Sequence, residues 1–350
     1  MDIFSLLDLT IEKQASDLHL VPGYFPAIRI NNDLSQLRTL ELINEENAKQ
    51  LISQILTEEQ KQNLFANKEL DCGYEHKGNR FRVNVYFSKG KLAAALRLIG
   101  SKLKTIEELF LPSYLHNMAD YRQGLVLVTG PTGEGKSTTL ASLVNEINQK
   151  YAKHIITVED PIEYVYPAGK SIISQRELHQ DTHSWSIALR AILREDPDVV
   201  LIGEMRDYET IQSALTIAET GHLVFSTLHT GSTPETINRI IDVFPAVQQN
   251  QIRIQLASVL RAVVAQRLVP NIDKTRRYPA LEVLFNIPAV ASVIRDGRIH
   301  MLDNILETSE KEGLYLFEKY LAYLSQKGFI TKDTAYAYAL RSNEIKKFLK

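Results

Sequence analysis

The sequence has almost no cysteine and no long hydrophobic run. Cys72 is the only cysteine among 350 residues, which excludes an intramolecular disulfide and a cysteine-rich zinc site and suits a reducing compartment. No window approaches the 18 uncharged apolar residues that a membrane-spanning helix needs. Residues 1–14 carry Asp2 and Asp8 and lack the basic start and apolar core of a signal peptide. These absences predict a cytoplasmic chain without a transmembrane segment.

An excess of charge of one sign is also missing. The chain has 40 Lys and Arg against 42 Asp and Glu, so its formal net charge is -2, and the basic residues are spread along it. A nucleic-acid-binding protein more often has a basic domain or stripe, so this balance disfavours a DNA motor. The remaining composition, 44% hydrophobic and 23% charged, is typical of a globular protein, and the length predicts two domains.

The pattern along the chain supports a division near residue 100. Residues 1–100 alternate short helical and strand-like segments, including a hairpin that turns at 89–91, and residues 101–112 are predicted to be a linker. From Gly124 onward, buried-strand runs alternate with helical segments, which predicts a parallel sheet covered on both faces. Beyond about residue 245 we expect mainly helix, with one apolar stripe formed by Ile252, Leu256, Val259, Leu260 and Val263.

The segment "GPTGEGKS" at 130–137 has the spacing of a phosphate-binding loop, and it lies between an apolar strand and an amphipathic helix. Its backbone N–H groups are expected to surround the phosphates, Lys136 to reach the β- and γ-phosphates, and Ser137 to bind Mg²⁺. The loop therefore predicts a bound nucleotide with Mg²⁺, but by itself it does not distinguish a kinase from a GTPase or a motor. The predicted cofactor-binding residues are Gly130, Pro131, Thr132, Gly133, Glu134, Gly135, Lys136, Ser137 and Thr138.

Glu134 places a carboxylate inside this loop. At about 6 Å from a phosphate charge it would cost roughly 1–3 kcal/mol unless solvent or a cation intervened. We therefore expect its side chain to point away from the phosphates. It would then be either an exposed glutamate or one half of an ion pair with a neighbouring subunit.

Acidic residues follow two of the predicted strands. Glu204 lies just beyond "VVLIG", where an acid can orient and deprotonate the water that attacks a nucleotide. "ITVEDPIEY" supplies Glu159, Asp160 and Glu163 in the same position relative to its own strand. Acids at strand ends are sometimes only helix caps or surface charges, but two such clusters at one sheet edge favour a catalytic site.

"GHLVFSTLHT" places His222 and His229 on either side of another buried-strand run. A histidine in such a place is often only packed or hydrogen-bonded within the fold. The sequence alone leaves both interpretations open.

These residues together resemble the secretion ATPase superfamily and, within it, the type IV pilus retraction ATPases, the PilT-like proteins. The resemblance covers almost the whole chain. It rests on a Walker A loop at 130–137, an Asp box in "ITVEDPIEY", a Walker B segment in "DPDVVLIGE" and a His box in "GHLVFSTLHT". The N-terminal "ASDLHL" and "RFRVNVY" are similar to the superfamily's N-terminal signatures.

The resemblance implies an α/β fold in which a PAS-like α+β domain over 1–100 precedes a RecA-like ATPase domain over 113–350, with a helical C-terminal part from about 271. It also implies that the nucleotide is ATP and that the chain forms a homo-hexamer, with each ATP held between the two domains of one subunit. By carry-over, Glu204 is the catalytic glutamate, Glu163 the Asp-box acid and His229 a nucleotide-sensing residue. Arg82 and Arg97 would approach the phosphates, although without the resemblance they would be interpreted as exposed hairpin residues.

The function implied is a motor that powers pilus retraction and twitching motility at an inner-membrane platform protein. It would be cytoplasmic and peripherally associated with the membrane through the pilus machine. The chain begins directly at the helix before "ASDLHL", and it cannot form the four-cysteine zinc site common in assembly ATPases. The segment "PAVASVIRDGR" matches the retraction-specific motif only loosely. A pilus-assembly or type II secretion ATPase, and a nucleotide-gated binding module with little turnover, are the alternatives.

Overall fold

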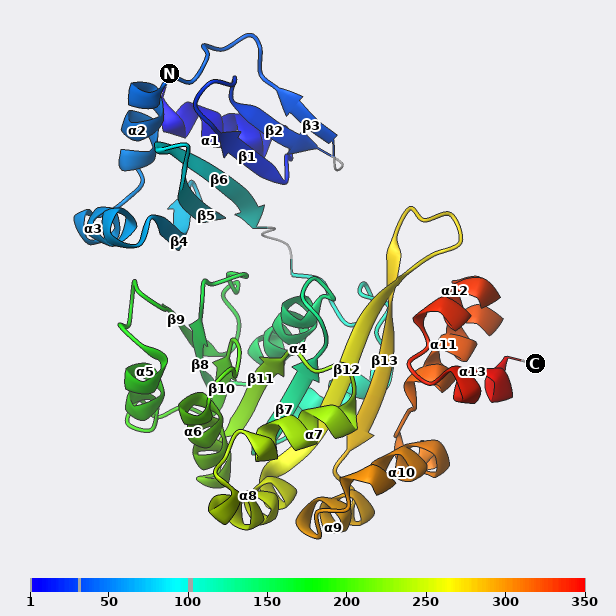
Figure 1. Ribbon diagram of the computed structural model, residues 1–350. Helices are drawn as coiled ribbons and strands as arrows, with labels where there is room; N and C mark the ends of the chain where they lie inside the picture. The colour runs from blue at the N-terminus through cyan, green and yellow to red at the C-terminus, as the bar shows by residue number, and fades with distance from the viewer. Residues whose placement is uncertain (1, 31–32, 100–102, 350) are drawn as a thin grey trace. The chain divides into compact units, whose positions relative to one another are not determined.

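The computed structural model describes residues 2–30, 33–99 and 103–349, which form two compact units (Figure 1). The first unit holds the described residues before position 100 together with Asp160–Val165 and Glu177–His179. The second unit holds Leu103–Glu159, Tyr166–Arg176 and the chain from Gln180 onward. The first two residues of the expected linker, 101–102, lie outside the described residues.

The first unit is a six-stranded sheet with helices packed on it, in the strand order β3-β2-β1-β6-β5-β4. Its neighbouring strands pair antiparallel throughout, and residues from α1, α2 and α3 share a core with the central strands. The elements are α1 (Ile3–Glu12), β1 (Asp17–Leu20), β2 (Ala27–Ile30), β3 (Asp33–Gln36), α2 (Glu45–Ser53), α3 (Glu58–Asn67), β4 (Glu69–His76), β5 (Asn79–Ser88) and β6 (Lys91–Ile99).

The hairpin expected from "RFRVNVYFSKGKLAAALRLI" is confirmed as β5 and β6. Phe81, Val83 and Val85 are buried at every second position of β5, because successive side chains of a strand point to opposite faces of the sheet. The turn places Lys89 and Gly90 at positive φ, which is the geometry of a two-residue hairpin loop.

Glu177 explains why two short segments distant in sequence belong to the first unit. Its buried carboxylate accepts hydrogen bonds from the N–H of Gly73 (2.7 Å) and the N–H of Ile162 (3.0 Å), and it forms an ion pair with Arg80. A Cβ on residue 73 would lie within 2.8 Å of both carboxylate oxygens, so a larger residue there would displace the Glu177 carboxylate. These bonds attach the segment after β8 to the hairpin of β4 and β5.

The second unit is a seven-stranded sheet in the order β13-β12-β7-β11-β10-β8-β9. Five neighbouring strands from β12 to β8 run parallel, and β13 pairs antiparallel with β12. The predicted α/β fold with a parallel sheet is therefore confirmed. The strands are β7 (Gly124–Thr129), β8 (His154–Glu159), β9 (Ile172–Glu177), β10 (Val199–Ile202), β11 (Leu223–Leu228), β12 (Leu260–Pro270) and β13 (Arg277–Phe285).

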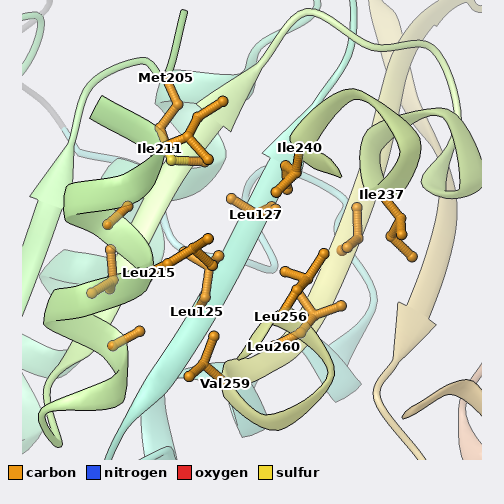
Figure 2. Close-up of a cluster of buried hydrophobic side chains, with 14 of the residues drawn as sticks. Leu125, Leu127, Met205, Ile211, Leu215, Ile237, Ile240, Leu256, Val259 and Leu260 are labelled. Carbon is orange, nitrogen blue, oxygen red and sulfur yellow. The ribbon is translucent and has the colours of Figure 1, made fainter. Parts of the chain in front are cut away.

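Helices cover both faces of this sheet, so the central strands β7, β10 and β11 are buried at every position. Leu125 and Leu127 of β7 belong to a core with α5 to α10, whereas Val126 and Val128 belong to a core with α4 and α11 to α13. Figure 2 shows the first core, with side chains of α6, α7 and α8 meeting β7. The helices are η1 (Ser113–Asp120), α4 (Lys136–Lys150), α5 (Trp185–Ile192), α6 (Tyr208–Glu219), α7 (Thr233–Asp242), α8 (Ala246–Val259), α9 (Pro288–Arg295), η2 (Ile299–Met301), α10 (Leu302–Thr308), η3 (Glu310–Glu312), α11 (Phe317–Gln326), α12 (Lys332–Tyr338) and α13 (Ser342–Phe348).

The single helical stripe expected beyond residue 245 is wrong in its second half. Ile252, Leu256 and Val259 do lie on α8, but Leu260 and Val263 belong to β12. A strand buried on both faces is apolar at consecutive positions, so its residues can continue the spacing of a preceding helical face. The helical C-terminal part accordingly begins at Pro288, after the hairpin of β12 and β13.

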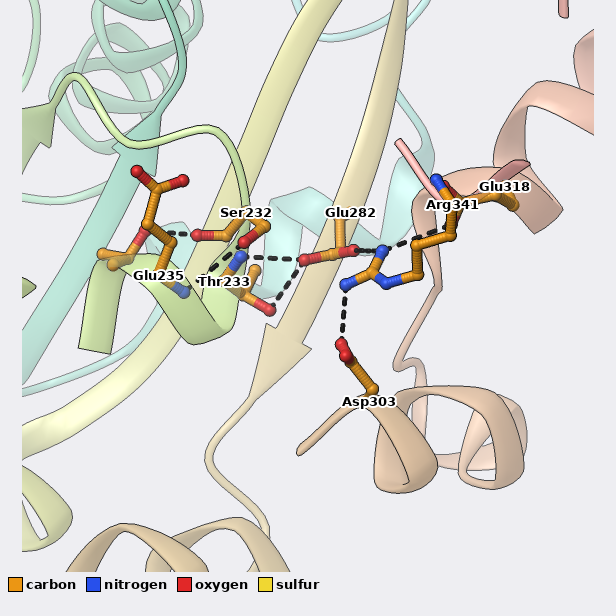
Figure 3. Close-up of polar contacts among 8 residues, drawn as sticks. Ser232, Thr233, Glu235, Glu282, Asp303, Glu318 and Arg341 are labelled. Carbon is orange, nitrogen blue, oxygen red and sulfur yellow. Dashed lines mark hydrogen bonds and ion pairs between the residues drawn. The ribbon is translucent and has the colours of Figure 1, made fainter. Parts of the chain in front are cut away.

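A buried polar cluster joins this hairpin to the C-terminal helices (Figure 3). The carboxylate of Glu282 on β13 accepts hydrogen bonds from Thr233 N (2.8 Å) and Thr233 Oγ1 (3.0 Å) at the start of α7. Arg341 lies 2.9 Å from Glu282 and 3.2 Å from Glu318, and its other nitrogen lies 2.6 Å from Asp303. Because Glu282 and Glu318 are both fully buried, Arg341 is the cation that compensates them.

Within the described ranges, no helix has both the length and the apolar character needed to cross a membrane.

Candidate active site

Residues from all four sequence motifs lie at one edge of the parallel sheet. Leu228 at the end of β11 is in register with Thr129 at the end of β7, and Ile202 at the end of β10 is in register with Val158 of β8. The phosphate loop, Glu204 and His229 therefore follow the carboxyl ends of β7, β10 and β11, and Glu159 is the last residue of β8. In open α/β sheets this is the edge at which ligands bind.

The phosphate loop joins β7 to α4 and has the backbone that its glycines predict. Gly130, Gly133 and Gly135 all have positive φ, and a Cβ on residue 130 would lie 2.3 Å from the carbonyl oxygen of Gln266. Lys136 is buried, and its Nζ donates to the carbonyl oxygens of Gly130 (2.8 Å) and Pro131 (3.0 Å). This part of the loop can donate several hydrogen bonds to a chain of phosphates. The donors are the Lys136 ammonium, the hydroxyls of Ser137 and Thr138, and the backbone N–H groups at the N-terminus of α4.

Glu134 does point out of the loop interior, as expected, and within this chain its carboxylate has a partner on a neighbouring strand. Its Oε2 accepts a hydrogen bond from the backbone N–H of Leu268 on β12. Its carbonyl oxygen accepts a second bond from Gln266 Nε2 at 2.7 Å. Sequence reasoning missed this partner because β12 was not expected to be a strand.

Glu204 and the phosphate loop are linked through His229. His229 Nε2 lies 2.9 Å from Glu204 Oε1, and its Nδ1 lies 3.3 Å from the hydroxyl of Thr132 in the loop. Arg206, two residues after Glu204, also forms an ion pair with the same carboxylate at 2.8 Å. The structure therefore brings together the predicted base, the predicted histidine and the loop, and adds an arginine that was not predicted.

The surroundings of Glu204 favour its charged form. Burial raises the pKa of Glu204, but the hydrogen bond from Arg206 and the nearby His229 outweigh burial, so the pKa lies below its ordinary value. The side chain remains one-fifth exposed. At neutral pH Glu204 is thus a carboxylate that can accept a hydrogen bond from water.

His222, the other histidine of this motif, is hydrogen-bonded within the fold. His222 lies before β11, at its opposite end from His229, and its Nδ1 lies 3.1 Å from the carbonyl oxygen of Ile217 near the end of α6. The same ring nitrogen lies 3.1 Å from the hydroxyl of Thr220. These contacts fit the interpretation of His222 as a packed residue.

Arg82, Arg97 and Glu163 belong to the first unit. Arg82 and Arg97 lie directly opposite each other on β5 and β6, and each has a carboxylate partner there. Arg82 Nε donates to Asp71 at 3.0 Å, and Arg97 Nε donates to Asp17 at 2.9 Å. The hydrogen bond to Asp71, with smaller effects of Glu163 and other acids, raises the pKa of Arg82.

A cleft of about 420 Å³ adjoins the first turn of α4 in the second unit. Phe110 forms part of its wall, and the Arg276 guanidinium lies 6.0 Å from the centre of that ring. The wall therefore offers one aromatic face and several cations beside the phosphate loop. Its lining residues are Lys104, Glu108, Leu109, Phe110, Leu111, Gly135, Thr138, Thr139, Gln266, Leu268, Arg276, Arg277 and Pro279.

Comparison with known proteins identifies the family. A family model described as "Type II/IV secretion system protein" matches residues 3–327. The type IV pilus retraction ATPase PilT of Pseudomonas aeruginosa is 41% identical over 96% of this chain and 97% of its own length. A twitching motility protein of Neisseria gonorrhoeae is 42% identical over 91% of this chain and 86% of its own length.

A solved structure agrees with these relatives. The crystal structure of the pilus retraction motor PilT with bound ADP superposes with a TM-score of 0.92 at 40% identity, covering 99% of both chains. The strand-end geometry, the family match and these full-length relatives together show that this chain is an ATPase of the type II/IV secretion system protein family and belongs to its PilT-like branch of pilus retraction ATPases.

Proposed function

We propose that this ATPase is a homo-hexameric motor that powers type IV pilus retraction and twitching motility. The observation that carries the proposal is its likeness to retraction ATPases over nearly the full length of both chains. The motor would act in the cytoplasm, on the inner-membrane platform protein of the pilus machine. A pilus-assembly or type II secretion role is the competing enzyme function.

The residues of the second unit have distinct roles in this proposal. Backbone N–H groups of the phosphate loop and Lys136 would bind the phosphates, and Ser137 would hold the Mg²⁺ that neutralises charge developing during phosphoryl transfer. Glu204 would orient the attacking water and accept its proton. The contacts of His229 with Glu204 and with Thr132 support a role for His229 in making the position of Glu204 respond to the loop.

The cleft beside α4 is proposed to hold the nucleoside part of ATP. It adjoins Gly135 and Thr138 of the loop, so a nucleotide whose phosphates occupy the loop would extend its sugar and base in this direction. Phe110 offers a flat apolar surface for the base.

Deleting the gene in its own host distinguishes retraction from assembly. Loss of a retraction motor leaves surface pili present or increased and abolishes twitching. Returning the wild-type gene, or the surface-control variant Glu312→Ala, to the deletion strain should restore twitching. Returning the Glu204→Gln variant should not. A deletion strain without surface pili would overturn the proposal and favour the assembly function.

The hexamer and the platform partner need separate measurements. The mass of the purified protein with ATP should be six times that of one chain. Its ATPase rate should change when the cytoplasmic part of the platform protein is added. A monomeric mass, or a rate insensitive to that fragment, would contradict the corresponding part of the proposal.

A further inference from the structure

Glu134 is bonded to β12 through both its side chain and its backbone. Its carboxylate accepts from Leu268 N–H, and its carbonyl oxygen accepts from Gln266 Nε2 at 2.7 Å. Gln266 is buried and also accepts a bond from Thr139 Oγ1 at 2.8 Å, which ties the same strand to the first turn of α4. The phosphate loop is thus attached to one strand on both sides of Gly135.

The place of Leu268 in the sheet explains why its N–H is available to the loop. The pairing of β12 with β7 ends at Ala265 opposite Thr129, where β7 gives way to the phosphate loop. The Glu134 carboxylate therefore supplies an acceptor to β12 just beyond the point at which the β7 ladder stops.

We propose that Glu134 is a positioning residue for nucleotide binding, and that it acts through the acceptor it offers to Leu268 rather than through its charge. The inference rests on the proposed role of the loop in phosphate binding. With both its oxygen groups bonded to β12, the Glu134 peptide is fixed in orientation. This fixes the direction of the N–H groups that follow it in the loop.

The acceptor and the charge of Glu134 have opposite effects on binding. A negative charge near bound phosphates weakens affinity, whereas an ordered loop strengthens it because less conformational freedom is lost when the nucleotide binds. Substitutions that remove one property and keep the other therefore separate the two. Glutamine keeps an acceptor of the same length without the charge, and aspartate keeps the charge on a shorter side chain.

The test compares Glu134→Gln, Glu134→Asp and Glu134→Ala in the full chain, with Glu312→Ala as a surface-glutamate control. A fluorescent ADP derivative gives the dissociation constant, and steady-state ATP hydrolysis gives KM and kcat. We expect aspartate and alanine to weaken binding and raise KM about fivefold, as for loss of one hydrogen bond, with kcat within twofold. Glutamine should bind at least as tightly as wild type, and the control should match wild type.

Three results would overturn the inference. If the glutamine and alanine variants bind nucleotide more tightly than wild type and equally so, only the charge of Glu134 matters. If the alanine and aspartate variants bind with wild-type affinity, neither the charge nor the acceptor matters. A lowered melting temperature and kcat at unchanged affinity would show a purely structural role. Lys136→Ala separates the proposed function from this inference: if it binds ADP normally, the assignment of the loop fails and the inference fails with it.

Discussion

Replacing Arg341 with methionine should strongly destabilise the ATPase unit. Methionine keeps most of the apolar stem but removes the guanidinium that lies 2.9 Å from Glu282 and 3.2 Å from Glu318. Both carboxylates are fully buried, so water cannot replace the lost cation. Breaking a buried ion pair from one side costs about 3–5 kcal/mol, which is a large part of the 5–15 kcal/mol that typically stabilises a domain.

The loss should depend on pH with a defined sign. Burial raises the pKa of Glu282, and the Arg341 charge opposes that rise, so removing Arg341 raises the pKa further. A carboxyl group with a raised folded-state pKa contributes stability that is complete below its unfolded pKa and is lost as pH rises through the folded value. The deficit of the variant should therefore be largest near pH 8 and shrink as pH falls toward 5.

Urea titration followed by tryptophan fluorescence measures the loss of stability in the second unit, which holds Arg341. Trp185, the only tryptophan of the chain, packs against the core of the ATPase unit. Adding Glu282→Gln and Glu318→Gln to the variant should recover most of the loss. Arg298→Met, which breaks an exposed pair with Asp296, should cost less than about 0.5 kcal/mol. A deficit for Arg341→Met below about 1 kcal/mol, or one independent of pH, would refute the reasoning.

Three further predictions concern the other charged groups. Glu204→Gln should lower kcat by about 100-fold or more while leaving ATP affinity within a few-fold, so near-normal steady-state turnover would contradict its assignment as the base. Arg82→Ala and Arg97→Ala should each reduce kcat while lowering stability by no more than about 1 kcal/mol, the contribution of a partly exposed ion pair, and a large fall in melting temperature at normal kcat would favour a structural role. Burial lowers the pKa of His116, but hydrogen bonds to Glu146 and Glu107 outweigh it and raise the pKa, so its stabilising effect is present at pH 6 and lost at higher pH. Melting temperatures of wild type should therefore fall relative to those of His116→Gln between pH 6 and 8.5, and parallel profiles would show that His116 contributes nothing.

The sequence was sufficient to predict the features that depend on local pattern. The phosphate loop could be recognised because its glycines, Lys136 and Ser137 are constrained by backbone geometry and by phosphate chemistry within eight residues. The position of Glu204 followed from the apolar run before it, since that run is a strand and its carboxyl end is the ligand-binding edge. The family and the fold class were confirmed, whereas the roles of individual site residues remain predictions.

The features that could not be predicted depend on contacts between distant residues. Leu268 is bonded to Glu134, and Gly73 to Glu177, although more than a hundred positions separate each pair. No local propensity encodes such a contact, because the partner is determined by how strands pair. The hairpin of β12 and β13 was missed for a related reason, and with it the partners of Glu134 and the surroundings of Arg341.

That hairpin has a mechanical consequence. Glu282, which holds the C-terminal helices through Arg341, is opposite Ala265, and Ala265 is followed directly by Gln266, which holds the phosphate loop. The contact of Glu282 with Arg341 and the contact of Gln266 with Glu134 are thus made by residues on neighbouring strands, one position apart in the register of the β12–β13 ladder. The C-terminal helices are therefore connected to the phosphate loop by the Arg341–Glu282 ion pair, one pair of the β12–β13 ladder and the Gln266–Glu134 hydrogen bond. A load on the C-terminal helices and the affinity for nucleotide would then be physically coupled within one chain.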